Sequence, residues 1–222
     1  MTTTAVARAA ERSWTHRGVA ITWWVVLVLA LAVAGYALAY VILGDRMYPP
    51  DLADSFRSRP WGIYTHVLFG SLAIGLGSLQ FRRALLLRRR RLHRTLGKIY
   101  LVSAMLTGVA GLYMAAYSFG GWITHAGFGL LAVALLTSTT TAYRAIKRRD
   151  VAVHRRWMLR SYALIFAAVT LRIELPLLIS YFDDFLAAYR VVAWLCWVPN
   201  LLAIELYLRR ARVGILPAPE SA

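Results

Sequence analysis

The sequence predicts an all-α membrane protein with six transmembrane helices, a four-helix core formed by spans two to five, and both termini in the cytoplasm. Three features predict this fold class: an apolar composition, six long apolar runs, and basic residues gathered between those runs. The 222-residue chain is 59% hydrophobic with a mean hydropathy of +0.56, a level that soluble domains rarely reach. Its net charge of +16 follows membrane topology rather than a nucleic-acid surface, so we expect no nucleic-acid partner.

Six apolar segments are each long enough for a helix to cross ~30 Å of hydrocarbon at ~1.5 Å per residue. They cover residues 19–43, 61–82, 96–119, 122–143, 157–181 and 187–208. A β-barrel is excluded because these segments are continuously apolar rather than alternating. The first run is too long for the core of a signal peptide, so we interpret it as a retained span. The expected regions are a cytoplasmic tail at 1–18, the transmembrane domain at 19–208 and a basic, disordered tail at 209–222.

The distribution of arginine and lysine predicts the orientation. The connections after spans two and four are strongly basic, as are the segments before the first span and after the last. The connection after span one is balanced in charge, and the one after span five carries Asp183 and Asp184. Because all basic segments fall on one side, we expect cytoplasmic termini and a location in the plasma (inner) membrane. Glu205 in span six lies close enough to that side to pair with a loop arginine.

Each of the four middle spans carries one histidine. His66 and His125 lie about one turn inside the outer ends of spans two and four, whereas His93 and His154 lie at the cytoplasmic entrances of spans three and five. The histidines therefore form two pairs of matched depth. Imidazole is a common metal ligand, so all four are candidate haem ligands. A structural role is the alternative, and for the inner pair so is a topology anchor or a site for an anionic headgroup, because arginines surround it.

Glycines flank both outer histidines on the helix face that residues four apart share. Gly62 and Gly70 lie around His66, and Gly121 and Gly129 lie around His125. A flat macrocycle needs small residues beside its axial ligand, so this pattern favours haem b at the outer side. Small residues at the same spacing also let membrane helices pack closely, which is the alternative.

Arg172 is a charged residue inside the fifth apolar run. It follows His154 by 18 residues, or five turns, and so shares its face about 27 Å along the helix, near the depth of the outer pair. An arginine within a span usually faces the bundle or a cavity. Its guanidinium matches the carboxylate geometry of a haem propionate, with Glu174 or Asp184 as alternative partners. Pro176 is expected to kink the same helix.

Three segments carry a resemblance to a known family: "HRTLGKIY", "GSLQFR", and "HRRWMLRSYAL" followed by "VTLR". They resemble, over nearly the whole chain, a bacterial family of six-span proteins known only as a domain of unknown function. The wider pattern is similar to the transmembrane ascorbate-reducible cytochrome b family, which has six helices and two haems in a four-helix core. That resemblance implies His66 with His125 at one haem, His93 with His154 at a second, and transmembrane electron transfer. The chain departs from it because His93 and His154 lie nearer the span ends.

Two functions therefore stand as hypotheses. The first is a cytochrome b-like transmembrane oxidoreductase that moves electrons across or along the membrane, with a quinone or small anionic reductant at the basic face. The second is a non-redox membrane protein, namely a small transporter, a lipid-binding protein or an assembly partner, with histidines as polar or ligand groups. No phosphate loop, paired carboxylates or activated nucleophile is present in the sequence, so we assign no catalytic residue. Membrane lipids are expected partners, and a homodimer is left open.

Overall fold

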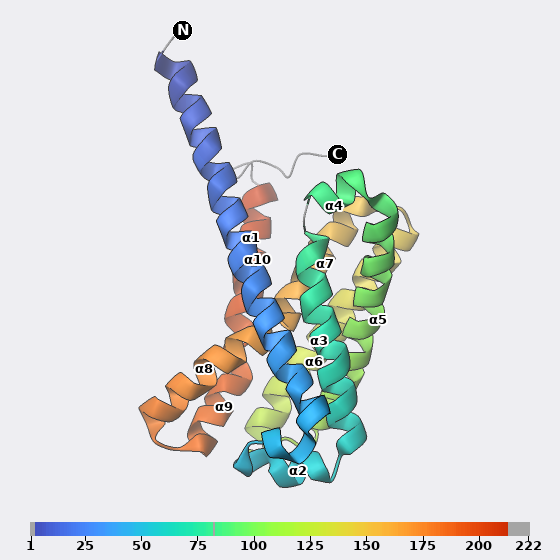
Figure 1. Cartoon of the computed structure of the whole chain (residues 1–222), viewed down its shortest axis with the longest axis vertical. Coiled ribbons are helices and arrows are strands. Elements are labelled where there is room, and N and C mark those ends of the chain that lie inside the picture. Colours follow the sequence, from blue (N-terminus) through green and yellow to red (C-terminus); the bar gives the residue numbers. More distant parts are fainter. Residues whose placement is uncertain (1–2, 82, 213–222) are drawn as a thin grey trace.

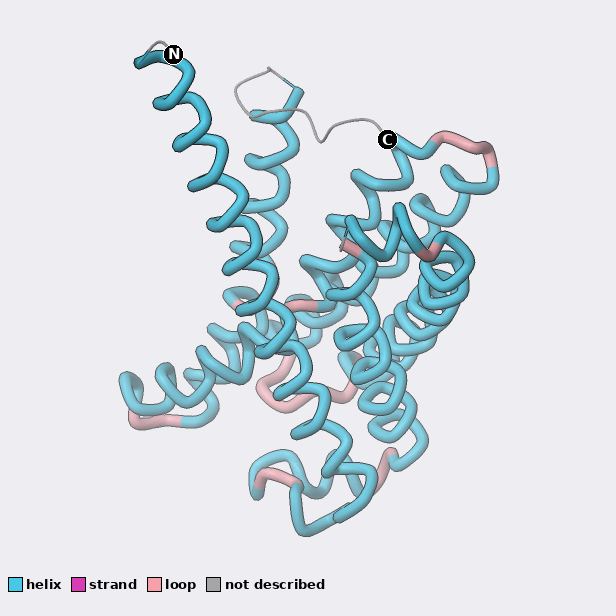
Figure 2. Tube along the Cα trace, turned by 45° about the horizontal axis from the view of Figure 1, so that its top comes forward, coloured by secondary structure: helices cyan, strands magenta, loops and turns pink. Residues whose placement is uncertain are grey.

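The computed structural model describes residues 3–81 and 83–212, and helices account for nearly all of that part of the chain (Figures 1 and 2). In chain order the elements are α1 (Thr3–Leu43), η1 (Gly44–Met47), η2 (Pro50–Leu52), α2 (Ala53–Arg57), α3 (Pro60–Gln80), α4 (Arg83–Arg88), α5 (Arg90–Ala115), α6 (Trp122–Lys147), α7 (Val151–Ile165), α8 (Ala167–Phe182), α9 (Phe185–Leu195) and α10 (Val198–Arg212). The prediction of an all-α fold is confirmed.

Within the described residues, six helical stretches are long and apolar enough to cross a membrane, which confirms the six expected spans. They are Ile21–Leu43, Pro60–Gln80, Arg90–Ala115, Trp122–Lys147, Val151–Phe182 and Phe185–Arg210. Because α1 begins at Thr3, the backbone of the expected N-terminal tail is helical and continuous with the first span. Of the expected C-terminal tail, α10 includes the backbone up to Arg212, and residues 213–222 lie outside the described part.

Local residues explain where several helices begin. The Asp150 carboxylate accepts a hydrogen bond from a backbone N–H in the first turn of α7, and Asp184 accepts two at the start of α9. Asp184, expected as an alternative partner of Arg172, is therefore a helix cap. The tight connection between α5 and α6 turns at Gly120 and Gly121, whose φ angles are +100° and +78°. Side chains other than glycine rarely adopt such angles.

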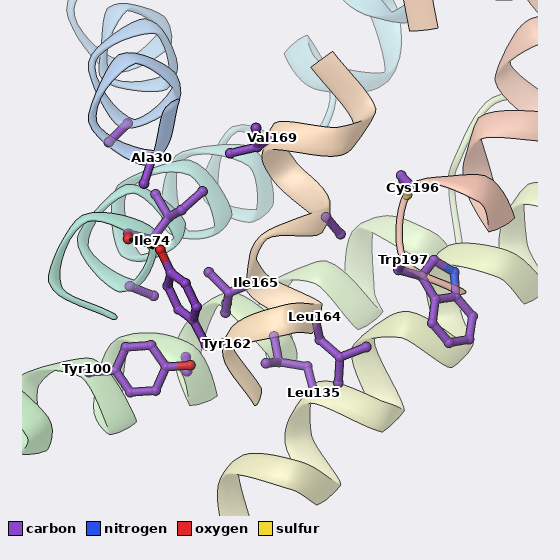
Figure 3. Close-up of a cluster of buried hydrophobic side chains, with 14 of the residues drawn as sticks. Ala30, Ile74, Tyr100, Leu135, Tyr162, Leu164, Ile165, Val169, Cys196 and Trp197 are labelled. Atoms are coloured by element: carbon purple, nitrogen blue, oxygen red, sulfur yellow. Dashed lines mark hydrogen bonds between the residues drawn. The ribbon is translucent and has the colours of Figure 1, made fainter. Parts of the chain in front are cut away.

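Helices α3, α5, α6 and α7 form the expected four-helix core. α5 packs against α3 and α6, α6 packs against α7, and α7 closes the ring on α3. α1 covers α3 from outside, and α10 packs on α7. In the centre of the core, Ile74, Tyr100 and Tyr162 converge (Figure 3). A buried chain of hydrogen bonds joins the Tyr100 hydroxyl to Ser161 at 2.8 Å and Ser161 to Thr139 at 2.9 Å, so these polar groups are satisfied.

The fifth and sixth spans are each interrupted. α7 passes into α8 at Phe166, and α9 passes into α10 at Cys196 and Trp197. α8 runs through Pro176, so the interruption in the fifth span lies well before the residue expected to kink it. The 32 residues of Val151–Phe182 would span about 48 Å, which exceeds the hydrocarbon thickness and requires tilt. The α8–α9 hairpin accordingly extends to one side of the bundle (Figures 1 and 2).

An ion pair ties α10 to the core. The Arg160 guanidinium on α7 donates two hydrogen bonds to the Glu205 carboxylate on α10, at 2.5 and 3.0 Å. Glu205 was expected to pair with a loop arginine. It does pair with an arginine, but Arg160 lies within α7 rather than in the loop before it. Figure 1 shows that the start of α1 and the end of α10 lie at the same end of the bundle as α4, which follows from an even number of spans.

Candidate functional site

The core places its four histidines on four different helices: His66 on α3, His93 on α5, His125 on α6 and His154 on α7. In the ring of core helices, α3 stands opposite α6 and α5 stands opposite α7. The pairs expected from the sequence therefore come from diagonally opposed helices, one near each end of the bundle.

The inner pair has ring nitrogens available to a ligand. The His154 Nδ1–H donates to the carbonyl of Ala142 at 2.9 Å, which leaves Nε2 as the bare nitrogen. The second nitrogen of a metal-ligating histidine usually donates to a carboxylate, a backbone carbonyl or water, and the Ala142 carbonyl is such a partner. Nδ1 of His93 is buried without a hydrogen-bond partner, and the two imidazoles lie near enough to interact electrostatically. These features suit the pair to bind a group between α5 and α7.

Gln80 adds a third polar group at this end, which sequence reasoning did not assign to the site. Its side chain is buried, at 8% exposure, and its Nε2 has no hydrogen-bond partner. Its Oε1 lies 3.3 Å from the point where a Cβ on Gly97 would stand. Gly97 is one helical turn beyond His93 on the same face, so the amide lies over the same stretch of α5. A lone amide at the end of an apolar span was the available sequence signal.

At the other end, His66 is held against α5. Its Nδ1–H donates to the carbonyl of Thr107 at 3.1 Å, and the Thr107 hydroxyl donates back to the His66 carbonyl at 2.8 Å. A Cβ on Gly111 would stand 3.2 Å from the imidazole, so the absence of a side chain at Gly111 lets the ring pack against α5. Part of the His66 surface nevertheless remains accessible. Thr107 and Gly111 are contacts that only the packing of α3 on α5 identifies.

His125 is arranged differently from the other three. Its Nε2–H donates to the carbonyl of Ser118 at 2.9 Å, in the connection between α5 and α6. Nδ1 is then the nitrogen left for another partner. Ligation through Nε2 would require the ring to leave Ser118, whereas no backbone carbonyl holds Nε2 of His93 or His154 among the described contacts.

The four flanking glycines fall into two kinds. A Cβ at Gly62 would stand 2.7 Å from the nearest α5 side-chain atom, and one at Gly70 would stand 3.1 Å from the Thr107 hydroxyl. Both therefore serve close packing of α3 on α5. A Cβ at Gly121 or Gly129 would meet nothing within 4 Å. Open space accordingly lies beside His125 on α6 rather than along α3.

Arg172 lies on α8 near His66, within range of an electrostatic interaction. One guanidinium nitrogen donates to the Ala168 carbonyl at 2.9 Å, and the guanidinium carbon stands 5.6 Å from the centre of the Tyr36 ring. Nε of Arg172 is buried without a partner, as is one carboxylate oxygen of Glu174. The expected alternative pairing of these two residues is absent among the described contacts. Arg172 therefore retains a donor for an anionic group.

Among the described residues, no group of three or more His, Cys, Asp and Glu side chains could hold a metal ion by itself. The inner pair instead supplies two imidazoles from opposed helices. Two axial imidazoles are the protein's whole share of a bis-histidine haem, because the macrocycle provides the other four ligands. The chemistry of this donor set, two imidazoles, is compatible with that group.

Comparison with known proteins identifies a family but no characterised relative. Residues 63–208 of the 222-residue chain match the family described as "Predicted membrane protein (DUF2306)", and this range includes Arg172 and all four core histidines. No curated protein and no solved structure matches the chain. The chain therefore belongs to the DUF2306 family of predicted membrane proteins.

Proposed function

We propose that the protein is a b-type cytochrome of the plasma membrane that transfers single electrons through histidine-ligated haem. The observation that carries the proposal is the inner pair. His93 and His154 come from opposed core helices, lie near each other, and each has a ring nitrogen without a protein partner. The orphaned Nδ1 of His93 and the carbonyl-anchored ring of His154 are two separate features that support a ligand between α5 and α7.

His93 and His154 would hold haem b through their imidazoles, and the haem would supply one-electron redox chemistry. The chain's own residues hold the ligating imidazoles in position and exclude other groups from the site. The Ala142 carbonyl holds the ring of His154 in one tautomer, and the buried amide of Gln80 offers N–H donors next to Gly97, one helical turn from His93. The arginines that begin α5 and α7 give this end a positive potential, which favours a small anionic reductant or a quinone there.

A second haem at the outer end would link the two sides of the membrane. His66 is prepared for ligation because Thr107 holds its Nδ1, and the open space beside Gly129 adjoins the helix of its expected partner, His125. Arg172 keeps a free donor that suits a propionate carboxylate. His125 would have to release the Ser118 carbonyl in order to ligate through Nε2.

The test is a visible spectrum of the purified protein from haem-replete cells, oxidised minus reduced, with haem quantitation. We expect His93→Ala and His154→Ala to remove the same reduced b-type band, and His66→Ala to remove a different one. Trp122→Phe, at an exposed residue on the end of α6, is the control and should leave both bands intact. A featureless spectrum of the unmodified chain would end the proposal. About one haem per chain, lost with His93 but retained without His66, would restrict it to the inner site.

One observation favours the second candidate, a small transporter. The fifth and sixth spans are interrupted, and the buried groups of Arg172 and Glu174 without partners lie just beyond the first interruption. Broken helices that carry polar groups line the substrate paths of many transporters. In proteoliposomes of haem-free protein, this function predicts anion uptake that Arg172→Met abolishes. Absence of uptake by the unmodified chain would exclude it for the anions tested.

A further inference from the structure

A groove on the membrane-facing side of the α3–α5 pair has no part in the proposed function. It has a volume of about 350 Å³ and lies where α3 begins, at the end opposite the arginine-rich loops. Its lining includes Arg59, Trp61, Gly62, Leu106, Val109 and Tyr113. A volume of this size is within the range of small-molecule sites.

The walls of the groove are apolar and open towards lipid. Leu106, Val109 and Tyr113 recur at three- and four-residue spacing on one face of α5, and all three are exposed. Gly62 lets α3 pack closely on α5 at this point, so it forms the floor of the groove. A channel between two membrane helices with this lining suits an alkyl chain better than it suits a polar molecule.

The mouth of the groove carries one positive charge. Arg59 donates to the Ser55 carbonyl at 3.3 Å and to the Ser58 hydroxyl at 2.7 Å, and its guanidinium carbon stands 4.0 Å from the centre of the Tyr117 ring. Both hydrogen bonds come from the same terminal guanidinium nitrogen, so Nε and the second terminal nitrogen are free to donate to a ligand. No carboxylate pairs with Arg59 among the described ion pairs, because the neighbouring Asp54 pairs with Arg57 at 3.4 Å.

We propose that this groove binds one anionic phospholipid, with its phosphate on Arg59 and one acyl chain between α3 and α5. Trp61, at 85% exposure, stands at the same level, where tryptophan anchors helices at the membrane interface. The cationic mouth and the apolar walls together favour a single molecule with an anionic headgroup and an apolar chain. A neutral quinone would leave the guanidinium charge unpaired, and a free phosphate would leave the apolar walls unused.

The test is native mass spectrometry of the full-length protein in detergent with phosphatidylglycerol, phosphatidylcholine or inorganic phosphate added. We expect one retained phosphatidylglycerol, with Arg59→Gln weakening its binding about five-fold, as suits one cation near an anionic lipid. Arg59→Lys should restore part of the binding. Val109→Trp should narrow the groove and reduce binding of both lipids.

Two matched variants serve as controls. Arg57→Gln removes an arginine that is already paired with Asp54. Val102→Trp enlarges a valine on the same face of α5 that is 57% exposed, as Val109 is, but lies outside the groove. The proposal is wrong if Arg59→Gln or Val109→Trp retains as much phosphatidylglycerol as its control. It is also wrong if inorganic phosphate, or a short-chain quinone, displaces the lipid. The haem spectrum of each variant, recorded in parallel, separates this outcome from any failure of the redox proposal.

Discussion

Glycines in the spans of this protein differ in the room that surrounds them. A Cβ on Gly77 would overlap the ring of Tyr162 and stand 2.8 Å from Tyr100, at the centre of the core. A Cβ on Gly129 would meet no atom within 4 Å. The same residue type therefore allows close packing at one position and leaves space unfilled at the other.

Substitution by alanine distinguishes these two glycines. Gly77→Ala is expected to lower the free energy of unfolding by about 1–3 kcal/mol, because overpacking forces two buried tyrosines to move. Gly129→Ala is expected to leave stability unchanged or to raise it by up to ~1 kcal/mol, because alanine favours the helix. Thermal unfolding of both variants in one detergent measures the difference. Equal midpoints would contradict the packing described at Gly77.

The histidines show at the same scale why residue type alone is an incomplete guide. His66 and His125 occupy equivalent positions in the sequence, one turn inside an apolar run and flanked by glycines. Yet Nδ1 of one and Nε2 of the other make the hydrogen bond to a backbone carbonyl. The carbonyls come from α5 and from the α5–α6 connection, whose positions no local pattern encodes.

At the scale of elements, the described contact that ties α10 to α7 most directly is the ion pair of Arg160 with Glu205. The two side chains are 14% and 31% exposed, so the pair is largely removed from solvent. Removing one partner leaves the other charge in a poorly solvated place, whereas removing both does not.

A double-mutant cycle tests that ion pair. Arg160→Met and Glu205→Met should each destabilise the protein by roughly 2–3 kcal/mol, with the double variant destabilised by less than either. Unfolding in detergent, followed by loss of helical circular dichroism, gives the free energies. Additive losses would show that the pair contributes nothing beyond its separate side chains.

The fifth span is interrupted at Phe166, and the sixth is interrupted at Cys196 and Trp197. Apolar runs of sufficient length predicted all six spans, because span length depends on local composition. Phe166 carries no helix-breaking signal, so the break in the fifth span was not predictable. Pro199, in the first turn of α10, does mark the break in the sixth span, because proline cannot donate the backbone hydrogen bond that would continue α9. Pro176, by contrast, lies inside α8. Membrane helices tolerate proline where neighbouring groups satisfy the freed backbone.

For the whole molecule, the orientation expected from the basic loops can be read with introduced cysteines. Cys196 is the chain's single cysteine and is fully buried, so it should stay silent towards a membrane-impermeant maleimide. Asp183→Cys should react in intact cells, and Arg148→Cys should react only after lysis, because positive loops stay in the cytoplasm. The reverse pattern would place the basic end of the bundle outside.

The sequence by itself determined the membrane class, the six spans and the four core helices that carry one histidine each. Those features depend on hydropathy, span length and spacing along one chain, which are local properties. Only the tertiary structure decided which ring nitrogens are occupied, that Gly62 and Gly70 serve packing whereas Gly129 adjoins open space, and that Gln80 lies against Gly97. Each of these depends on which atom of another helix lies opposite, and side-chain packing between helices sets that.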